Sequence, residues 1–267
     1  MSRPSVLVLD SGIGGLSIVG NIREVCPHLQ IHYLADLAGF PYGIKSEQEL
    51  IQRVVGLLEF SLPVYQPQIV VIACNTASTL VLDELRRQFE VPFVGVVPAI
   101  KPAAQLTLSG VIAVLATEGT VNRDYTRRLV HDFASDKKVI LYGSAKLVFL
   151  AEQKLKGHPS NNADIDNEVG ALKNHPLLDT VVLACTHFPL LKDELSRALP
   201  QVKYWVDSGE AIARRVQYWL NQINAVDICV DGTPHNHFLF TGTNDFVYIP
   251  RLVRELLGEF TIQKIME

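Results

Sequence analysis

The chain alternates short aliphatic and β-branched runs with longer amphipathic stretches along most of its length. Such runs occupy residues 6–9, 31–35, 69–73, 93–97, 111–115, 138–142 and 180–184, and helical periodicity follows each of them. Continuous apolar runs of this length are typical of strands that are buried on both faces of a sheet. Because parallel strands need long crossover connections between them, the alternation predicts an α/β fold with mainly parallel sheets.

Local signals indicate where some connections begin. Ser46 is followed by Glu49 three residues later, which is a capping box and predicts a helix start. A second helix is expected to begin close to Thr76, directly after the run at 69–73. The polar stretch 157–167 is expected to form a surface loop.

Two turns predict how this pattern divides into domains. The segment 98–102 follows a strand and holds two prolines, and residues 206–209 form a second strand-to-helix turn. We expect one α/β domain of residues 1–97 with 207–267 and another of residues 98–206. A weak internal repeat, VIACNT at 71–76 and VLACTH at 182–187, falls once in each domain. Two similar domains would then face each other across a ligand-binding cleft with one thiol on each side.

Composition excludes several classes of protein. The formal net charge of −4 does not favour nonspecific binding to nucleic acid. No apolar run reaches the roughly 18 residues that a membrane-spanning helix requires. The first ten residues lack the three-part form of a secretory signal, so we expect a soluble cytoplasmic protein. The cysteines, which include no C-x-x-C pair, are expected to be free thiols.

Cys74 and Cys185 are the strongest candidates for chemistry. Each is expected at the carboxyl end of a strand and in the first turn of a helix, where unpaired N–H groups and the helix dipole favour a thiolate. Cys26 and Cys229 lack this placement and are expected to fill the core. His187, two residues after Cys185, is a candidate proton partner, although a single histidine there could also cap or pack.

Cofactor and metal sites find little support in the sequence. Cys185 and His187 could begin a zinc site, but no second Cys/His pair or H-E-x-x-H motif follows. The turn at 10–15 resembles a dinucleotide fingerprint in which Ser17 replaces the third glycine and Asp36 would be the ribose-binding acid. Amides of this turn could instead hold a carboxylate, with Asp10 as an acid or base.

Two other enzyme classes are disfavoured for similar reasons. A serine hydrolase would need a G-x-S-x-G elbow, which the chain lacks. Pyridoxal phosphate chemistry would need a lysine in a phosphate-binding context, and none is found. The segment PYG at 41–43 is expected to form a second turn at the same edge of the sheet as residues 10–15, and its sequence would also suit an ordinary β-turn.

The chain resembles the glutamate racemases of the aspartate/glutamate racemase superfamily across nearly its whole length. The motifs that carry the resemblance are DSGIGGL at 10–16, PYG at 41–43, ACNTA at 73–77 and ACTHFPLL at 184–191. The resemblance implies cofactor-independent interconversion of L- and D-glutamate, no metal, and a supply of D-glutamate for peptidoglycan synthesis. The resemblance is compatible with a homodimer but does not decide the oligomeric state.

The resemblance also implies a role for each site residue. Cys74 would deprotonate D-glutamate and Cys185 would deprotonate L-glutamate, so that each direction uses one thiolate and one thiol. Asp10 would assist Cys74, and His187 with Glu152 would assist Cys185. The chain departs from the family pattern directly before Glu152, where it has GSAKLVFLA. The substrate would be held by Ser11, Tyr42, Gly43, Asn75, Thr76 and Thr186, together with Asp10 and His187.

Two rival functions remain at this point. One is another enzyme of the superfamily, such as an aspartate racemase or a one-cysteine decarboxylase, although two cysteines disfavour the decarboxylase. The other is a non-catalytic protein of two domains that binds an amino acid. Such binding proteins are usually exported, whereas this chain has no recognisable signal segment.

Overall fold

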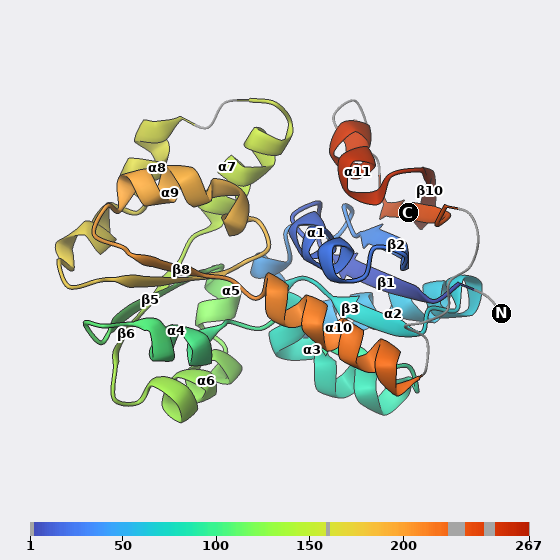
Figure 1. Cartoon of the computed structure of the whole chain (residues 1–267), viewed down its shortest axis with the longest axis horizontal. Coiled ribbons are helices and arrows are strands. Elements are labelled where there is room, and N and C mark those ends of the chain that lie inside the picture. The colour runs from blue at the N-terminus through green and yellow to red at the C-terminus, as the bar shows by residue number, and fades with distance from the viewer. Residues whose placement is uncertain (1–2, 159–160, 224–232, 243–248, 267) are drawn as a thin grey trace. The chain divides into compact units, whose positions relative to one another are not determined.

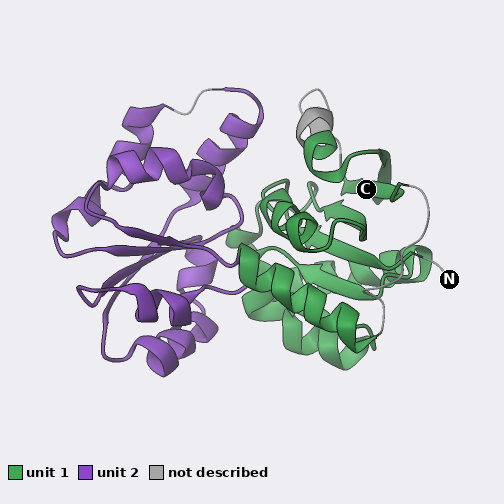
Figure 2. Cartoon of the chain, in the orientation of Figure 1, with its two compact units in different colours: residues 1–96, 209–267 green, residues 97–208 purple. Residues whose placement is uncertain are grey.

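The computed structural model describes residues 3–158, 161–223, 233–242 and 249–266, with the backbone alone at 249–252. The chain gathers into two compact units, Met1–Val96 with Gly209–Glu267 and Val97–Ser208 (Figure 2). The domain limits expected from the sequence, 1–97 with 207–267 and 98–206, stay a prediction, because compactness alone does not identify the segments that fold independently. The expected cleft between the domains also stays a prediction.

The first unit contains a six-stranded parallel sheet in the order β10-β9-β2-β1-β3-β4 (Figure 1). Its elements in chain order are β1 (Ser5–Asp10), α1 (Leu16–Val25), β2 (Gln30–Ala35), the 3₁₀ helix η1 (Tyr42–Ile44), α2 (Glu47–Tyr65), β3 (Ile69–Ile72), α3 (Asn75–Gln88), β4 (Phe93–Gly95), α10 (Gly209–Gln222), β9 (Asn236–Thr241), α11 (Ile249–Leu257) and β10 (Phe260–Met266).

Apolar side chains on both faces of this sheet are buried. Leu7 and Leu9 of β1 share a core with Val70 and Ile72 of β3 and with the apolar faces of α2 and α3. Successive side chains of a strand point to opposite faces, and the residues between these, such as Val8, are also fully buried. Helix α1 packs beside α10 and α11. Continuous apolar strands therefore form here because helices cover the sheet on both sides.

The second unit contains a four-stranded parallel sheet in the order β6-β5-β7-β8 (Figure 1). Its elements are α4 (Ile100–Leu106), β5 (Val111–Ala116), α5 (Glu118–Val121), α6 (Asp124–Ala134), β6 (Lys138–Gly143), α7 (Ala145–Leu155), α8 (Asn162–Glu168), the 3₁₀ helix η2 (Gly170–Asn174), β7 (Thr180–Ala184), the 3₁₀ helix η3 (Phe188–Leu191), α9 (Lys192–Ala198) and β8 (Tyr204–Val206). Ile112, Val114 and Val182 of its central strands pack against α4 and α6.

The predicted fold class is confirmed, and each strand expected from the sequence is present. Ser46 caps α2 as expected, because its side chain accepts a hydrogen bond from the Glu49 N–H at 3.3 Å. Helix α3 begins at Asn75, directly after Cys74. Among the helices that the structure describes, none combines the length and apolar character needed to cross a membrane.

Two local predictions are wrong. The run at 138–142 was expected to be a buried strand, but β6 lies at the edge of its sheet and is partly exposed along its whole length. The stretch 157–167 was expected to be a loop, but α8 begins at Asn162 inside it. Asn161 caps this helix by accepting a hydrogen bond from the Ala163 N–H at 3.0 Å.

Candidate active site

Cys74 follows a central strand of the first sheet, at the edge where open α/β sheets bind ligands. Strand β1 pairs with β2 on one side and with β3 on the other. Successive strands of the chain are therefore added on opposite sides of β1, and open α/β sheets bind ligands at such a reversal of strand order. Ser11 follows β1, and Cys74 follows β3. Both side chains are buried, and the Cys74 thiol donates to Ser11 Oγ at 3.9 Å.

Asp10 and Asn75 lie directly beside these two residues in sequence. Asp10 is fully buried, and its Oδ2 accepts a hydrogen bond from the Gly15 N–H at 2.6 Å. A turn amide thus holds a carboxylate of the protein itself. Asn75 is 3% exposed, and its Nδ2 has no hydrogen-bond partner within the described part of the chain. A buried donor left unpaired is costly, so this amide is suited to a polar group of a bound ligand.

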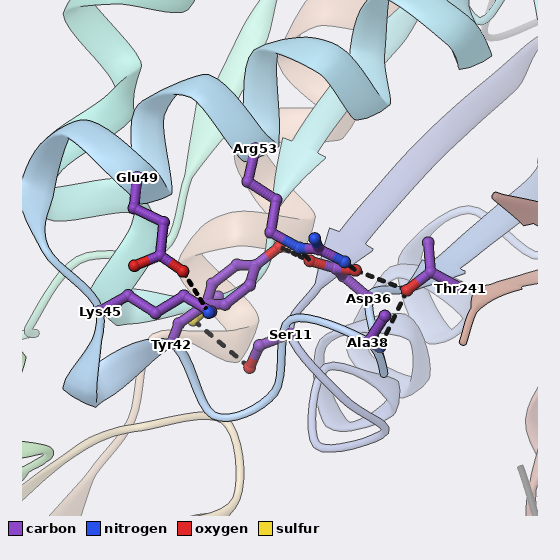
Figure 3. A network of polar contacts seen from close by, with 9 residues as sticks. Ser11, Asp36, Ala38, Tyr42, Lys45, Glu49, Arg53 and Thr241 are labelled. Carbon is purple, nitrogen blue, oxygen red and sulfur yellow. Dashed lines mark hydrogen bonds and ion pairs between the residues drawn. The ribbon is translucent and has the colours of Figure 1, made fainter. Parts of the chain in front are cut away.

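Tyr42 and Gly43 form the start of η1 in the first unit. The Tyr42 side chain is buried, and its hydroxyl donates to Asp36 Oδ2 at 2.6 Å (Figure 3). Burial, the hydrogen bond and charge of Asp36, and the charge of Cys74 raise the pKa of Tyr42 well above its usual value. The phenol therefore remains protonated and can donate to Asp36 throughout the physiological pH range.

Asp36 does not fit the ribose-binding role considered for it. Its Oδ1 accepts hydrogen bonds from Arg53 Nη2 at 2.6 Å and Thr241 Oγ1 at 2.5 Å, and its Oδ2 accepts from Arg53 Nε at 2.5 Å as well as from Tyr42. With both oxygens engaged inside the protein, a dinucleotide ribose has no free carboxylate to bind. Sequence reasoning missed Arg53 and Thr241, which lie too far from Asp36 along the chain to form a motif.

Cys185 follows a central strand of the second sheet in the same way. Strand β5 pairs with β6 and β7, and Cys185 lies directly after β7. Its Sγ lies 3.9 Å from His187 Nδ1, while His187 Nε2 lies 2.8 Å from Glu152 Oε1 of α7. The structure therefore brings together Cys185, His187 and Glu152, the three residues that the family resemblance grouped.

The surroundings of His187 determine its charge. Burial by itself lowers the pKa of His187, but hydrogen bonds and charge interactions with Cys185 and Glu152 outweigh this effect and raise the pKa from 6.5 to about 10. The imidazole is therefore protonated near neutral pH and donates from both nitrogens. The charged imidazole thus places an N–H donor beside the Cys185 sulfur.

Cys185 differs from Cys74 in its relation to the following helix. Cys74 is the N-cap of α3. Cys185 was expected in the first turn of a helix, but it is followed by the short 3₁₀ helix η3, which begins only at Phe188. The expectation of a helix dipole at this thiol is therefore wrong, and His187 is the nearby positive group. Thr186, between the two, is buried.

Two threonines, Thr117 and Thr120, follow the central strand β5 of the second unit. Thr117 follows β5, beside β7, and its Oγ1 lies 3.1 Å from Thr120 Oγ1. Cys26 is a free, half-buried thiol at the end of α1, where burial raises its pKa, rather than a core residue. Cys229 lies outside the described residues.

Within the described ranges, no group of three or more His, Cys, Asp or Glu could hold a metal ion.

Comparison with known proteins places the chain in a family. The family model for Asp/Glu/Hydantoin racemases matches residues 14–216. A glutamate racemase of Klebsiella pneumoniae is 50% identical over 84% of this chain and 80% of its own length. A glutamate racemase of Haemophilus influenzae is 45% identical over 83% of this chain and 82% of its own length.

Solved structures agree with these matches. The structure of Escherichia coli glutamate racemase in complex with L-glutamate and the activator UDP-MurNAc-ala is 40% identical, with a TM-score of 0.91 over 99% of each chain. Glutamate racemase isoform RacE1 of Bacillus anthracis is 26% identical, with a TM-score of 0.82 over 99% of this chain and 98% of that one. The chain therefore belongs to the Asp/Glu/Hydantoin racemase family and, within it, to the glutamate racemases, which are isomerases.

Proposed function

We propose that this protein interconverts L- and D-glutamate without a cofactor, using Cys74 and Cys185 as two opposed acid–base groups. One observation carries the proposal. In each sheet a buried thiol follows a central strand, at the point where the strand order reverses. Membership of the glutamate racemase group supports glutamate as the substrate. The solved Escherichia coli relative binds L-glutamate, and we extend that substrate to this chain.

Inversion at Cα requires proton removal from one face and proton delivery to the other. One thiolate and one thiol perform these steps if they act on opposite faces of the same carbon. With L-glutamate, the Cys185 thiolate takes the α-proton and the Cys74 thiol returns a proton to the opposite face. With D-glutamate the two roles are exchanged. Each turnover leaves the thiol and thiolate interchanged, and proton exchange with water restores the starting form.

Neighbouring residues prepare each thiol for its role. Protonated His187, fixed by Glu152 at 2.8 Å, stabilises the Cys185 thiolate and supplies a proton when that cysteine must return to the thiol form. In the first unit, Ser11 Oγ accepts from the Cys74 thiol. Asp10, held by the Gly15 amide, assists proton exchange at Cys74.

The substrate is held by polar groups close to the two thiols in sequence. The Nδ2 of Asn75, which has no hydrogen-bond partner among the described residues, binds the α-amino and α-carboxylate groups together with Thr76 and Thr186. Ser11, Tyr42 and Gly43 bind the other end of glutamate. Such contacts stabilise charge on the α-carboxylate while the carbanion forms, which is the difficult step without an electron sink.

The biological role follows from the product. We propose that the D-glutamate supplies peptidoglycan synthesis, and the Escherichia coli relative crystallised with a UDP-MurNAc-ala activator supports this assignment. The cytoplasmic location stays a prediction, and so does assembly into a homodimer.

A circular dichroism assay tests the activity directly. Pure L-glutamate, incubated with the purified, dialysed protein and no added cofactor, is expected to lose its optical signal until the two enantiomers are equal. Pure D-glutamate should approach the same end point from the opposite sign. L-aspartate is the matched comparison, and faster loss of its signal would replace glutamate by aspartate as the substrate. No loss with either amino acid would contradict the proposed function.

A further inference from the structure

A buried polar network surrounds Asp36 at the base of the Tyr42 turn (Figure 3). The Asp36 side chain has no exposed area, and it is bound by three elements that lie far apart in the sequence. Tyr42 belongs to η1, Arg53 to α2 and Thr241 to β9. Arg53 approaches the carboxylate with two nitrogens, Nε at 2.5 Å and Nη2 at 2.6 Å. Bidentate contacts of this kind fix direction as well as position.

The loop between β2 and η1 is tied to the same network. Thr241 donates its hydroxyl to Asp36 Oδ1 and accepts a hydrogen bond from the Ala38 N–H at 3.0 Å. Gly39 packs directly on the ion pair, because a Cβ placed there would lie 2.2 Å from Asp36 Oδ2 and 2.3 Å from Arg53 Nε. The loop therefore has little room to move without breaking contacts at Asp36.

The network neutralises a charge that would otherwise be unfavourable. An isolated carboxylate in the interior is costly, and the Arg53 guanidinium balances Asp36 while Tyr42 and Thr241 satisfy its remaining acceptor sites. In these hydrogen bonds the Tyr42 hydroxyl is directed at Asp36 and so is not free for another acceptor. The phenol thus acts as a fixed point for the turn, and the backbone at 41–43 is the part left to meet a ligand.

We propose that Asp36, Arg53 and Thr241 are positioning residues that hold the Tyr42 turn in its substrate-binding conformation. This inference rests on the proposed function, since it takes the turn to bind glutamate. None of the three residues touches the substrate in this account. Loss of the network lets the turn move, which weakens binding of both enantiomers, because the turn holds the end of glutamate that does not react.

Thr241 offers a matched pair of variants. Thr241→Ser keeps the hydroxyl and should behave like the wild type, whereas Thr241→Val has the same shape but lacks the hydrogen bonds to Asp36 and Ala38. Thr241→Val and Arg53→Met should each raise KM for L- and D-glutamate about tenfold, the equivalent of one hydrogen bond to a charged group. The turnover number kcat should change by less than about twofold.

Two controls separate positioning from general stability and from charge. Ile22→Val removes a methylene from the fully buried interior side of α1 and should destabilise the unit without raising KM. Glu49→Gln removes an exposed charge from the same helix as Arg53 and should leave KM unchanged. Equal KM increases in Ile22→Val and Thr241→Val would overturn the inference.

Hydrogen exchange of the backbone amides gives a readout that does not depend on activity. Peptides covering residues 36–45 should exchange at least about tenfold faster in Thr241→Val and Arg53→Met than in Thr241→Ser, with no change in peptides of the β1–α1 segment. Unchanged exchange in both variants would overturn the inference even if the wild type racemises glutamate. If the wild type proves inactive, the proposed function fails, and the exchange rates alone decide whether the network holds the turn.

Discussion

Cys74 and Cys185 differ in the groups that surround them. Cys185 has a charged partner, because the raised pKa of His187 keeps the imidazole protonated beside the sulfur. Cys74 has the Ser11 hydroxyl at 3.9 Å and lies at the N-terminus of α3, where backbone N–H groups point outward. In the proposed mechanism a charged side chain therefore assists proton transfer at Cys185, whereas a hydroxyl and backbone N–H groups do so at Cys74.

Replacing either cysteine should abolish racemisation. Cys74→Ala and Cys185→Ala each remove one of two obligatory proton carriers, so the rate should fall by at least about 10⁴-fold. Cys26→Ala is the control, because Cys26 is half-buried at the end of α1 and takes no part in the mechanism. The measurement is the circular dichroism assay, with thermal unfolding to check that each variant folds. Substantial turnover in either active-site variant would refute the two-thiol mechanism.

His187 should make folding stability depend on pH. Its pKa is raised to about 10 in the folded protein, while the value in the unfolded chain is near 6.5. The protonated histidine thus stabilises the fold fully below about pH 6.5, and this contribution is lost as pH rises through about 10. The difference in unfolding free energy between the wild type and His187→Asn should therefore shrink from pH 6 to pH 10.

Urea unfolding at several pH values measures that difference. Glu152→Gln removes one of the two partners that raise the pKa of His187, so the loss should be smaller and should be complete at lower pH in this variant. An NMR titration that places the His187 pKa near 6.5 in the wild type would show that the proposed thiolate–imidazolium pair does not form.

Helix α2 connects the core of the first unit to the Asp36 network. Ser46 caps the N-terminus of the helix, and Arg53 lies in its second turn. Gln66 is the C-cap residue. Gln66 has φ 44° and ψ 50°, a left-handed conformation that favours glycine. Its N–H still donates to Leu62 O at 3.0 Å, so the chain turns sharply here before β3.

Gln66→Gly should stabilise the protein by up to about 1 kcal/mol, because glycine adopts this conformation without steric cost. Gln66→Ala is the control, since it removes the same side chain while keeping the unfavourable Cβ, and it should not stabilise. Thermal unfolding of the two variants and the wild type gives the comparison. Equal stability of the glycine and alanine variants would show that the left-handed backbone carries no strain.

The elements that sequence reasoning found share a strong local signal. The apolar runs of β1, β3, β5 and β7 are central strands, whose burial on both faces is visible in the sequence itself. β8 is only three residues long, and β9 contains Asn236 and His237 among its apolar residues, so neither gives a continuous run. Helix α8 was missed because Asn and Asp dominate it, and its stability comes from packing with α9.

At the scale of the whole molecule, the parallel topology of each unit explains which site residues could be found. Residues such as Ser11, Cys74 and Cys185 directly follow buried strands, so a strand pattern with polar residues at its end is enough to select them. The sequence indicates Asp36 only by its distance from a glycine turn, and it gives no signal for the partners Arg53 and Thr241. Those partners are set by three-dimensional packing of α2 and β9 against β2, which no local pattern records.

The central claim is that two opposed thiols exchange the α-proton of glutamate, and isotope incorporation in D₂O tests it most directly. The thiol that delivers the proton has exchanged with solvent before the substrate binds, so early D-glutamate product should carry deuterium at Cα in nearly every molecule. Unreacted L-glutamate should carry little. Mass spectrometry of the separated enantiomers at low conversion provides the measurement. Largely unlabelled D-glutamate would mean that one base carries the same hydrogen between faces, and would contradict the roles of Cys74 and Cys185.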